Sequence, residues 1–359
     1  MSGGVDSSVA AYLMKAEGYR CMGTTMRLYE NNDALFRENN TCCSRRDFHD
    51  ACEVALKLGI HYEVLDLTRD FKECVIDKFI RTYEEGGVPN PCVDCNRYIK
   101  FGRLFDFADR NGLWYVVTGH YARIGFDPDS DRYFLKKARY LEKDQSYVLY
   151  MLTQKELARL KLPLGELKKE ETRKIAEEQG FCNAEKHDSQ DICFVPDGDY
   201  AAFMEKASGK KYPDGQIKDE SGNVLGIHHG AVRYTTGQRR GLGIASEKRL
   251  YVTGKDMESN TVYLGPESAL YSDTLYASEV NWISGEVPKE PLRVRARVRY
   301  RQEEKPATVF PEGPDRLMLK FDEPLRAITA GQAAVLYDAE DGDTVLGGGT
   351  IAADLNYNG

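Results

Sequence analysis

The sequence predicts an α/β protein in which a parallel-sheet domain is followed by a small β-rich middle domain and a C-terminal β-barrel. Helical and strand patterns alternate over residues 1–195, and this alternation is typical of a parallel sheet with helical crossovers. Glycines and short alternating segments dominate residues 196–267. Residues 268–359 contain short alternating strands, which we expect to close into a small barrel or sandwich.

The first domain is predicted element by element from hydrophobic spacing and from turn residues. Its expected strands are 21–29, 61–67 and 113–117. Its expected helices are one that ends at Gly18 and further ones at 44–58, 70–84, 96–111, 145–160 and 169–179. The turn residues at 127–131 are expected to join two antiparallel strands.

Length, charge and cysteine content restrict the class of protein. A chain of 359 residues usually forms two or three domains. It has no run of about 18 apolar residues, so we expect no membrane partner. Nine cysteines without a signal-peptide pattern favour the reducing cytoplasm. The net charge of -8 does not exclude nucleic acid, because local patches determine the field at a docking surface.

A glycine- and serine-rich loop opens the first predicted helix. Its residues are Ser2, Gly3, Gly4, Val5, Asp6, Ser7 and Ser8. Two glycines allow an anion to approach the backbone, and the helix N-terminus adds N–H donors and a positive dipole end. The loop lacks the lysine of a Walker A motif. It therefore predicts a phosphate or pyrophosphate site without lysine-assisted transfer of a γ-phosphate.

Two cysteine segments are candidates for nucleophilic chemistry. Cys92 and Cys95 lie in the segment 90–96, which we expect to be a loop directly before a helix. The helix dipole, together with Arg97, would then stabilise a Cys95 thiolate. Cys193 is expected at the end of a strand near the first domain boundary. Half of a zinc site or a redox pair are the alternative explanations for the C-x-x-C spacing.

Arginines alternate with apolar residues near the start of the last domain. The alternate positions are Arg293, Arg295, Arg297, Arg299 and Arg301. In a strand they would share one face, and five like charges repel one another unless an anion lies over them. We therefore expect contact with RNA phosphates. A second basic group in the middle domain would extend the patch and consists of Arg239, Arg240, Lys248 and Arg249.

These motifs together resemble those of the tRNA-specific 2-thiouridylases. The loop at 2–8 is similar to the PP-loop of ATP pyrophosphatases, which implies a Rossmann-like fold of the adenine nucleotide alpha hydrolase type. The likeness also includes NPCVDCN at 90–96, VTGHYAR at 117–123, KDQSY at 143–147, SQDICF at 189–194, YTTGQRRGLG at 234–243 and GQ at 331–332. It spans nearly the whole chain in the expected order.

The resemblance implies a mechanism. ATP, with Mg²⁺ that Asp6 helps to orient, would adenylate the position-2 oxygen of the wobble uridine in tRNAs of the Lys, Glu and Gln type. A sulfur-donor protein, either a cysteine desulfurase or a relay protein, would load Cys193 with a persulfide. Sulfur would then attack the activated carbon, and Cys95 would release it by forming a Cys95–Cys193 disulfide.

The resemblance also implies binding roles. Met26 and Gly119 would contact the nucleotide, while Asn90, Pro91 and Cys92 would contact the target base. The further residues implied to contact tRNA are His120, Lys143, Asp144, Gln145, Arg299, Tyr300 and Gln332. For His120, the residue pattern alone favours a polar side chain that ends a strand.

Three alternatives stay open. Many relatives have Asp at the position of Cys92, so a 4Fe–4S cluster on Cys92, Cys95 and Cys193 competes with the persulfide route. A PP-loop ligase or amidotransferase acting on a small molecule would share the first loop. An RNA-binding or Fe–S scaffold protein would not turn over ATP.

The position of the phosphate loop leads to a further expectation. Such loops follow a buried strand, and here only Met1 precedes Ser2. We expect Met1 to be an internal residue of a longer natural protein.

Overall fold

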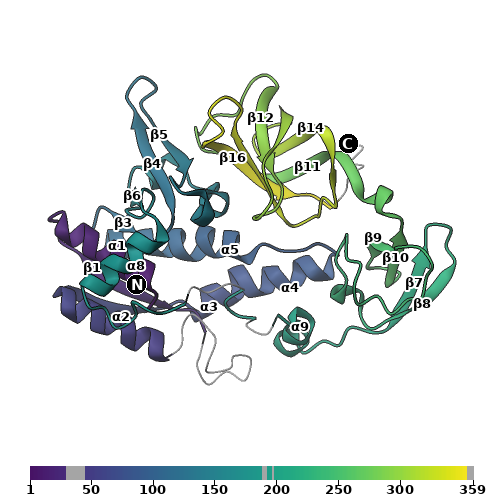
Figure 1. Cartoon of the computed structure of the whole chain (residues 1–359), viewed down its shortest axis with the longest axis horizontal. Coiled ribbons are helices and arrows are strands. Elements are labelled where there is room, and N and C mark those ends of the chain that lie inside the picture. Colours follow the sequence, from purple (N-terminus) through teal and green to yellow (C-terminus); the bar gives the residue numbers. More distant parts are fainter. Residues whose placement is uncertain (30–44, 188–191, 196–197, 354–359) are drawn as a thin grey trace.

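The computed structural model describes residues 1–29, 45–187, 192–195 and 198–353. Figure 1 shows three parts: an N-terminal α/β part, a β-rich middle part and a C-terminal barrel that lies over the long helices. Within the described ranges, no helix combines the length and apolarity needed to cross a membrane.

The N-terminal part alternates helices and strands as expected. Its strands are β1 (Met22–Arg27), β2 (His61–Asp66), β3 (Val116–Val117), β4 (Ala122–Asp127), β5 (Arg132–Lys137) and β6 (Leu160–Lys161). Its helices are α1 (Val5–Ala16), α2 (Arg45–Leu58), α3 (Thr68–Phe71), η1 (Lys72–Ile76), α4 (Asp77–Glu84), α5 (Pro91–Asp94), η2 (Cys95–Arg103), α6 (Leu104–Arg110), η3 (Leu141–Lys143), η4 (Ser146–Leu149), α7 (Gln154–Leu157) and α8 (Lys169–Glu178). The structure confirms the α/β class.

The parallel sheet consists of two separate pairs of strands. β1 pairs with β2 in parallel, with Met22 opposite His61, and β3 pairs in parallel with β6. In the described part of the chain these pairs are not hydrogen-bonded to each other. Met1 lies beside β1, because its amino group donates to the carbonyl of Thr24. The expectation that the natural chain is longer stays a prediction.

Two of the helix predictions were wrong in their limits. The helix expected at 96–111 begins at Pro91, and it runs without interruption through α5, η2 and α6. Proline at the first helical position accounts for this start, since it lacks only an N–H that has no partner there. The helix expected at 145–160 is instead two short turns, because Thr153 caps a new helix with its side chain.

The middle part is a four-stranded sheet with one unexpected helix, α9 (Tyr200–Ser208). Its strands have the order β8-β7-β10-β9. Their bounds, with that of the short helix η5, are β7 (Gly215–Asp219), β8 (Val224–His228), η5 (Ala231–Arg233), β9 (Tyr251–Asp256) and β10 (Thr261–Gly265). α9 lies close to α4 (Figure 1), and the rings of Phe79 and Phe203 are in edge contact.

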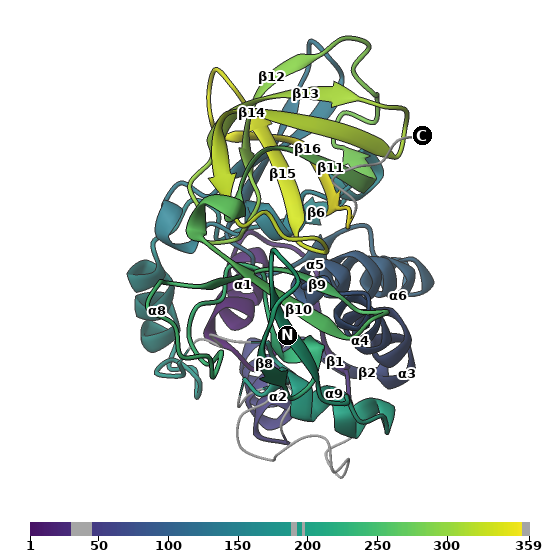
Figure 2. The same cartoon turned by 90° about the vertical axis from the view of Figure 1, so that its right-hand side faces the viewer.

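The C-terminal part is a closed six-stranded barrel. After η6 (Glu267–Leu270), its strands are β11 (Tyr271–Trp282), β12 (Leu292–Arg297), β13 (Lys305–Pro311), β14 (Arg316–Arg326), β15 (Ala333–Asp338) and β16 (Thr344–Ile351). The order is β11-β14-β13-β12-β15-β16, and pairing of β16 with β11 closes the barrel (Figure 2). The hairpin of β4 and β5 pairs with the outside of β16, so this sheet crosses between domains.

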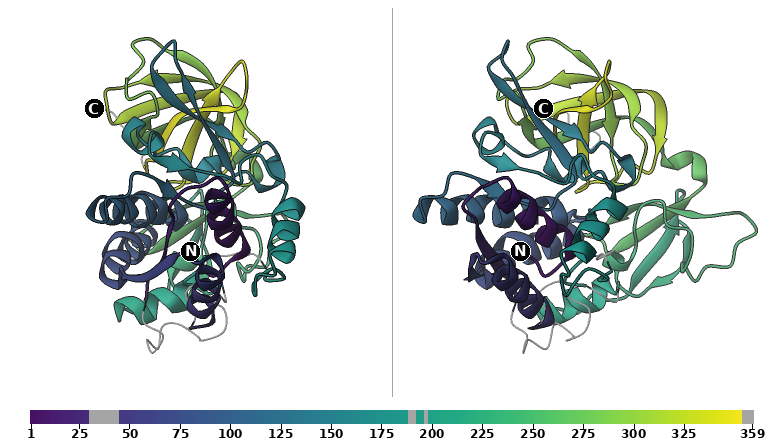
Figure 3. Two further views of the ribbon diagram at one scale, coloured as in Figure 1. Left: turned by 90° about the vertical axis from the view of Figure 1, so that its left-hand side faces the viewer. Right: turned by 60° about the vertical axis from the view of Figure 1, so that its left-hand side comes forward.

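The barrel rests directly on the segment 147–152 and, through Gln332, on the segment that leads into the cysteine helix, by which we mean the continuous helix of α5, η2 and α6. Asn281 donates to the carbonyls of Tyr150 and Leu152 at 2.8 and 3.0 Å. The hydroxyl of Tyr147, which is fully buried, donates to the carbonyl of Ala333. Figure 3 shows the barrel seated above the N-terminal helices from two further sides. The C-terminal barrel therefore forms one wall around the candidate site.

Candidate active site

The phosphate loop adopts a tight turn at the N-terminus of α1. Gly4 is the N-cap residue, and Gly3 has a positive φ of 72°. A Cβ on Gly3 would lie 2.4 Å from the carbonyl oxygen of Asp47, so only glycine fits there. The Ser7 hydroxyl donates to the Gly4 carbonyl at 3.1 Å and accepts from the Ser2 N–H at 3.0 Å. The loop is therefore shaped before any anion binds.

A lysine that the sequence did not reveal holds this turn from outside. The Nζ of Lys186 donates to the Gly3 carbonyl at 3.1 Å and pairs with Asp47 at 2.5 Å and Asp50 at 2.7 Å. Asn183 donates to the same carbonyl at 3.0 Å. These contacts fix the loop between α2 and the segment that follows α8.

Asp6 is engaged by a second cation that the sequence reasoning missed. Its carboxylate accepts from Lys169 at 2.6 Å and from the Tyr121 hydroxyl at 2.8 Å. Lys169 is the first residue of α8, where the positive end of the helix dipole disfavours a lysine. A lysine at the N-terminus of a helix is unusual, and this was the feature of the sequence that could have indicated a nearby anionic partner. Mg²⁺ at Asp6 stays a prediction.

Two nucleotide-contact candidates lie beside the loop or along the neighbouring strand. A Cβ on Gly119 would be 2.7 Å from the carbonyl carbon of Asp6, so this glycine permits close approach of backbone to the loop. Met26 lies near the end of β1 and packs against the core that contains Cys95. Their contact with ATP stays a prediction.

Cys92 and Cys95 lie within a helix, which corrects the expected loop. Cys92 belongs to the first turn of the helix that begins at Pro91, whereas Cys95 is one turn further along. Cys92 is exposed and Cys95 is only 9% exposed. Placement of Cys95 beyond the first turn weakens the argument that the helix dipole lowers its pKa, since that effect falls off within one turn.

Cys193 lies in a turn rather than at the end of a strand, which corrects a second expectation. The turn is closed by the Val195 N–H, which donates to the Ile192 carbonyl at 2.9 Å. Phe194 anchors it with 1% exposure and ring contacts to Phe71 and Phe79. Residues 189–191 of the same motif lie outside the described residues.

The two candidate catalytic cysteines contact the same hydrophobic core. Cys95 belongs to the cluster formed by η1, α4 and α9, and Cys193 packs against it. Cys95 is buried and Cys193 is half-buried. Among the described side chains, no three His, Cys, Asp or Glu residues are arranged to hold a metal ion. The Fe–S alternative on Cys92, Cys95 and Cys193 stays a prediction.

Several predicted tRNA contacts have structural partners instead of exposed polar atoms. The Asp144 carboxylate is buried and accepts from the N–H groups of Ala138 and Ser146 at 3.0 and 3.1 Å. The amide oxygen of Gln145 accepts from the Tyr121 N–H at 2.9 Å. These two side chains shape the loop at 138–146, and Lys143 on the same loop is partly exposed.

His120 is buried rather than presented to a ligand. Its Nδ1 lies 2.8 Å from the Thr118 hydroxyl, and its Nε2 lies 3.5 Å from Lys100. Burial, together with the charge of Lys100, lowers the pKa of His120 well below 6.5. The imidazole is therefore neutral near pH 7.

Barrel residues hold the segment that carries the predicted target-base residues Asn90, Pro91 and Cys92. Gln332 donates to the carbonyls of Val88 and Pro89 at 3.0 and 3.1 Å. The hydroxyl of Tyr300 donates to the carbonyl of Asp144 at 3.1 Å. Tyr300 as a residue is 42% exposed. Gln332 thus positions the site backbone, and Tyr300 presents an aromatic face at its rim.

The arginine strand keeps the predicted alternation only as far as Arg297, where β12 ends, because Arg299 and Arg301 lie in the turn that follows. It also lacks the predicted excess of charge. Val294, Ala296 and Val298 are buried, while the arginines between them face outward. Arg293 pairs with Asp322 at 2.7 Å, and Arg297 pairs with the Glu304 carboxylate. The premise of five unbalanced cations was therefore wrong, because acidic side chains from neighbouring segments neutralise part of the face.

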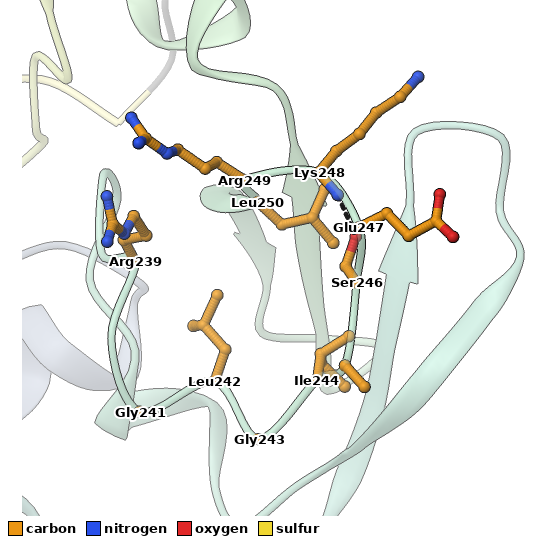
Figure 4. A pocket seen from close by; sticks show the side chains of 11 residues that line it. Arg239, Gly241, Leu242, Gly243, Ile244, Ser246, Glu247, Lys248, Arg249 and Leu250 are labelled. Carbon is orange, nitrogen blue, oxygen red and sulfur yellow. Dashed lines mark hydrogen bonds between the residues drawn. The ribbon is translucent and has the colours of Figure 1, made fainter.

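The middle domain contributes a glycine-rich basic loop at 239–250 that surrounds a hollow of about 540 Å³. Figure 4 shows the side chains of Leu242 and Ile244 on the inner side, with Arg239, Lys248 and Arg249 directed outward. The N–H of Lys248 donates to the Ser246 hydroxyl at 3.2 Å. The loop presents cations without an enclosed small-molecule cavity.

A phosphate-loop domain, a β-rich middle domain and a barrel define a class of multidomain nucleotide-dependent RNA-modifying protein. Residues 1–197 match the family model described as a tRNA methyl transferase HUP domain. Residues 201–266 match its PRC-barrel domain, and 272–351 match the aminomethyltransferase beta-barrel domain.

Curated relatives then specify the family. A tRNA-specific 2-thiouridylase of Clostridioides difficile is 47% identical over 355 residues, which cover 99% of this chain and 97% of that protein. Those of Caldanaerobacter subterraneus and Acetivibrio thermocellus are each 45% identical over 352 residues, which cover 98% of this chain and 96% and 97% of theirs. The chain belongs to the tRNA-specific 2-thiouridylase family.

Proposed function

We propose that this protein is an ATP-dependent tRNA sulfurtransferase that 2-thiolates the wobble uridine. The observation that carries the proposal is that Cys95 and Cys193 pack against the same hydrophobic core, although 98 positions of sequence separate them. A small-molecule ligase would have no evident need for this pair or for a barrel beside it. The family relationship supports the same activity.

The phosphate loop has the role of holding the pyrophosphate part of ATP at the N-terminus of α1. The uridine oxygen at position 2 attacks the α-phosphate, and pyrophosphate leaves. Adenylation converts that oxygen into part of a good leaving group, AMP. Lys186 and Lys169, each paired with carboxylates, hold the loop and Asp6 in place for the anion.

Sulfur transfer uses the two packed cysteines. A sulfur-donor protein supplies a persulfide on Cys193, and its terminal sulfur attacks C2 of the uridine while AMP departs. The Cys95 thiol then attacks the sulfur of Cys193, which breaks the persulfide S–S bond and leaves sulfur on C2. The product disulfide joins Cys95 and Cys193, and a cellular thiol reduces it.

The exposed residues at the rim are assigned to tRNA. Cys92 and Tyr300 lie where the barrel covers the start of the cysteine helix, and an exposed aromatic ring suits stacking on an unpaired base. Arg301 and the basic loop of Figure 4 are assigned to phosphates of the same RNA. The side chains of Asp144, Gln145 and His120 instead stabilise the loops around the site through hydrogen bonds within the protein.

The proposal is tested by incubating the protein with ATP, an unmodified tRNA transcript and a cysteine desulfurase with its substrate. We expect AMP and 2-thiouridine, detected by nucleoside mass spectrometry. Cys193→Ser should abolish 2-thiouridine, whereas Cys182→Ser, at an exposed cysteine away from this core, should retain it. Absence of 2-thiouridine from folded wild-type protein with an active donor contradicts the proposal. Activity of iron-free protein excludes the cluster variant.

A further inference from the structure

A cluster of four charged side chains lies where the barrel meets the cysteine helix. Lys78 of α4 pairs with Asp94 of α5 at 3.0 Å and with Glu279 of β11 at 3.1 Å. Arg97 lies 3.8 Å from Glu279. The cluster contains two cations and two anions, and the Asp94 and Lys78 side chains are only 9% and 19% exposed. Such partly buried pairs hold their geometry because losing one partner leaves a charge uncompensated.

The backbone at Glu279 is specialised for this contact. Its φ is 51°, a left-handed conformation that residues with a Cβ rarely adopt. The pairing of β11 with β16 shifts register between Ser278 and Asn281, so the strand bulges at this point. Thr350 of β16 donates to the Glu279 carboxylate at 3.0 Å. The barrel therefore directs one carboxylate out of its wall and onto Lys78.

The cluster acts on the turn that carries the cysteines. Asp94 lies between Cys92 and Cys95 in sequence, in the helix that begins at Pro91. Its neighbour Cys95 packs against the core formed in part by Phe79, which directly follows Lys78. The same two helices thus share an ion pair and a hydrophobic contact beside the thiol.

We propose that Glu279 is a positioning residue for Cys95, acting through Lys78 and Asp94 to fix the cysteine helix against the barrel. Its effect on turnover rests on the proposed function, whereas its effect on the thiol does not. Burial raises the pKa of Asp94, and Lys78 offsets part of that shift. Burial also acts to raise the pKa of Glu279, but the pair with Lys78 outweighs it and leaves that pKa lowered. Glu279 is therefore charged at neutral pH.

The first test measures the reactivity of Cys95 without any substrate. In Glu279→Gln, we expect iodoacetamide to alkylate Cys95 roughly tenfold faster, as read by peptide mass spectrometry, because the helix is no longer held. Alkylation of the exposed Cys182, which lies outside the cysteine helix, serves as an internal reference. Glu286→Gln is the matched control, because Glu286 is an exposed barrel carboxylate that pairs with Arg132. It should leave Cys95 unchanged.

A second variant separates positioning from stability. Glu279→Gly removes the carboxylate but accepts the positive φ without strain, so it should unfold at a higher temperature than Glu279→Gln. A positioning role predicts fast Cys95 alkylation in both variants, whereas a purely structural role predicts that reactivity follows stability. Slow alkylation in folded Glu279→Gly overturns the proposal.

The third readout is turnover. We expect the kcat for thiolation to fall about tenfold in both Glu279 variants, while the KM for ATP stays within twofold. An unchanged kcat overturns the proposal. If wild-type protein forms no thiouridine, the proposed function fails, and the alkylation result still decides the role of Glu279.

Discussion

Replacement of Lys186 by methionine tests how the phosphate loop is held. The methionine keeps most of the side-chain volume but removes a charge that contacts Gly3, Asp47 and Asp50 within 3.1 Å. The two carboxylates are 8% and 11% exposed, so they would become buried anions without this partner. Because Lys186 is 29% exposed, we take the lower end of the usual range for a broken buried pair, about 3 kcal/mol.

That loss of stability corresponds to a fall in the melting temperature of roughly 6–12 °C for a domain the size of the N-terminal part, about 150–250 residues. Burial lowers the pKa of Lys186, but hydrogen bonds to Asp47 and Asp50 outweigh it and leave the pKa above 10.5. Because its pKa is raised on folding, Lys186 makes its full contribution to the free energy of unfolding below pH 10.5. That contribution is lost only as the pH rises above 10.5. The difference between wild type and variant should therefore be constant from pH 6 to 9.

The variant should also bind ATP poorly. The Gly3 carbonyl accepts hydrogen bonds from Lys186 and Asn183, and in the variant it keeps only the one from Asn183. We expect the KM for ATP to rise about tenfold, equivalent to about 1.4 kcal/mol. Lys57→Met is the matched control, since Lys57 of α2 also donates to a carbonyl, that of Gly180, at 2.7 Å, but is exposed. Calorimetry and steady-state AMP formation provide the two measurements. A melting temperature within 2 °C of wild type, or an unchanged KM, would refute the reasoning.

Three further predictions concern separate parts of the structure. Gly119→Ala places a Cβ 2.7 Å from the Asp6 backbone and should abolish ATP-dependent AMP formation, while the melting temperature reports whether the fold survives. The pKa of His120 is depressed, so its neutral state contributes fully to the free energy of unfolding above pH 6.5, and this contribution is lost as the pH falls. In denaturant titrations, the free energy of unfolding of wild type should fall by up to about 1.4 kcal/mol per pH unit below pH 6.5, relative to that of His120→Asn. Parallel curves for the two proteins would contradict this. Arg293→Gln should change tRNA affinity less than twofold in a filter-binding assay, because Asp322 already neutralises this exposed arginine, and a large loss would show that RNA displaces Asp322.

Local patterns in the sequence were enough to predict the fold class and the order of most elements. The loop at 2–8, the parallel strands and the hairpin at 127–131 all follow from glycine positions and hydrophobic spacing. The failures occurred where tertiary contacts override propensity. Residues 145–160 have helical spacing, yet Tyr147 and Tyr150 are recruited into the core beneath the barrel.

The candidate site was predictable by motif but not by environment. Sequence reasoning selected Cys95 and Cys193, and the structure packs both against one core. It did not reveal Lys186 or Lys169, because their partners in the phosphate loop lie 183 and 163 positions away. It also overestimated the arginine face, because Asp322 of β14 and Glu304, which directly precedes β13, approach it from other parts of the chain. Charge pairs between residues far apart in the chain were thus the main feature of the site that could not be predicted from sequence patterns.

The pairing of β5 with β16 affects how the chain can be assembled during synthesis. Lys136 and its partner Asp341 beside this junction are 205 residues apart, so at about 5–20 residues per second the ribosome needs roughly 10–40 s to supply the second strand. During that interval the early hairpin exposes an unpaired edge that could join a foreign strand. Its Lys136 and Lys137 side chains place charge along this edge. The last strand of the barrel, once made, both closes the barrel and covers that edge, so the final folding step completes two domains together.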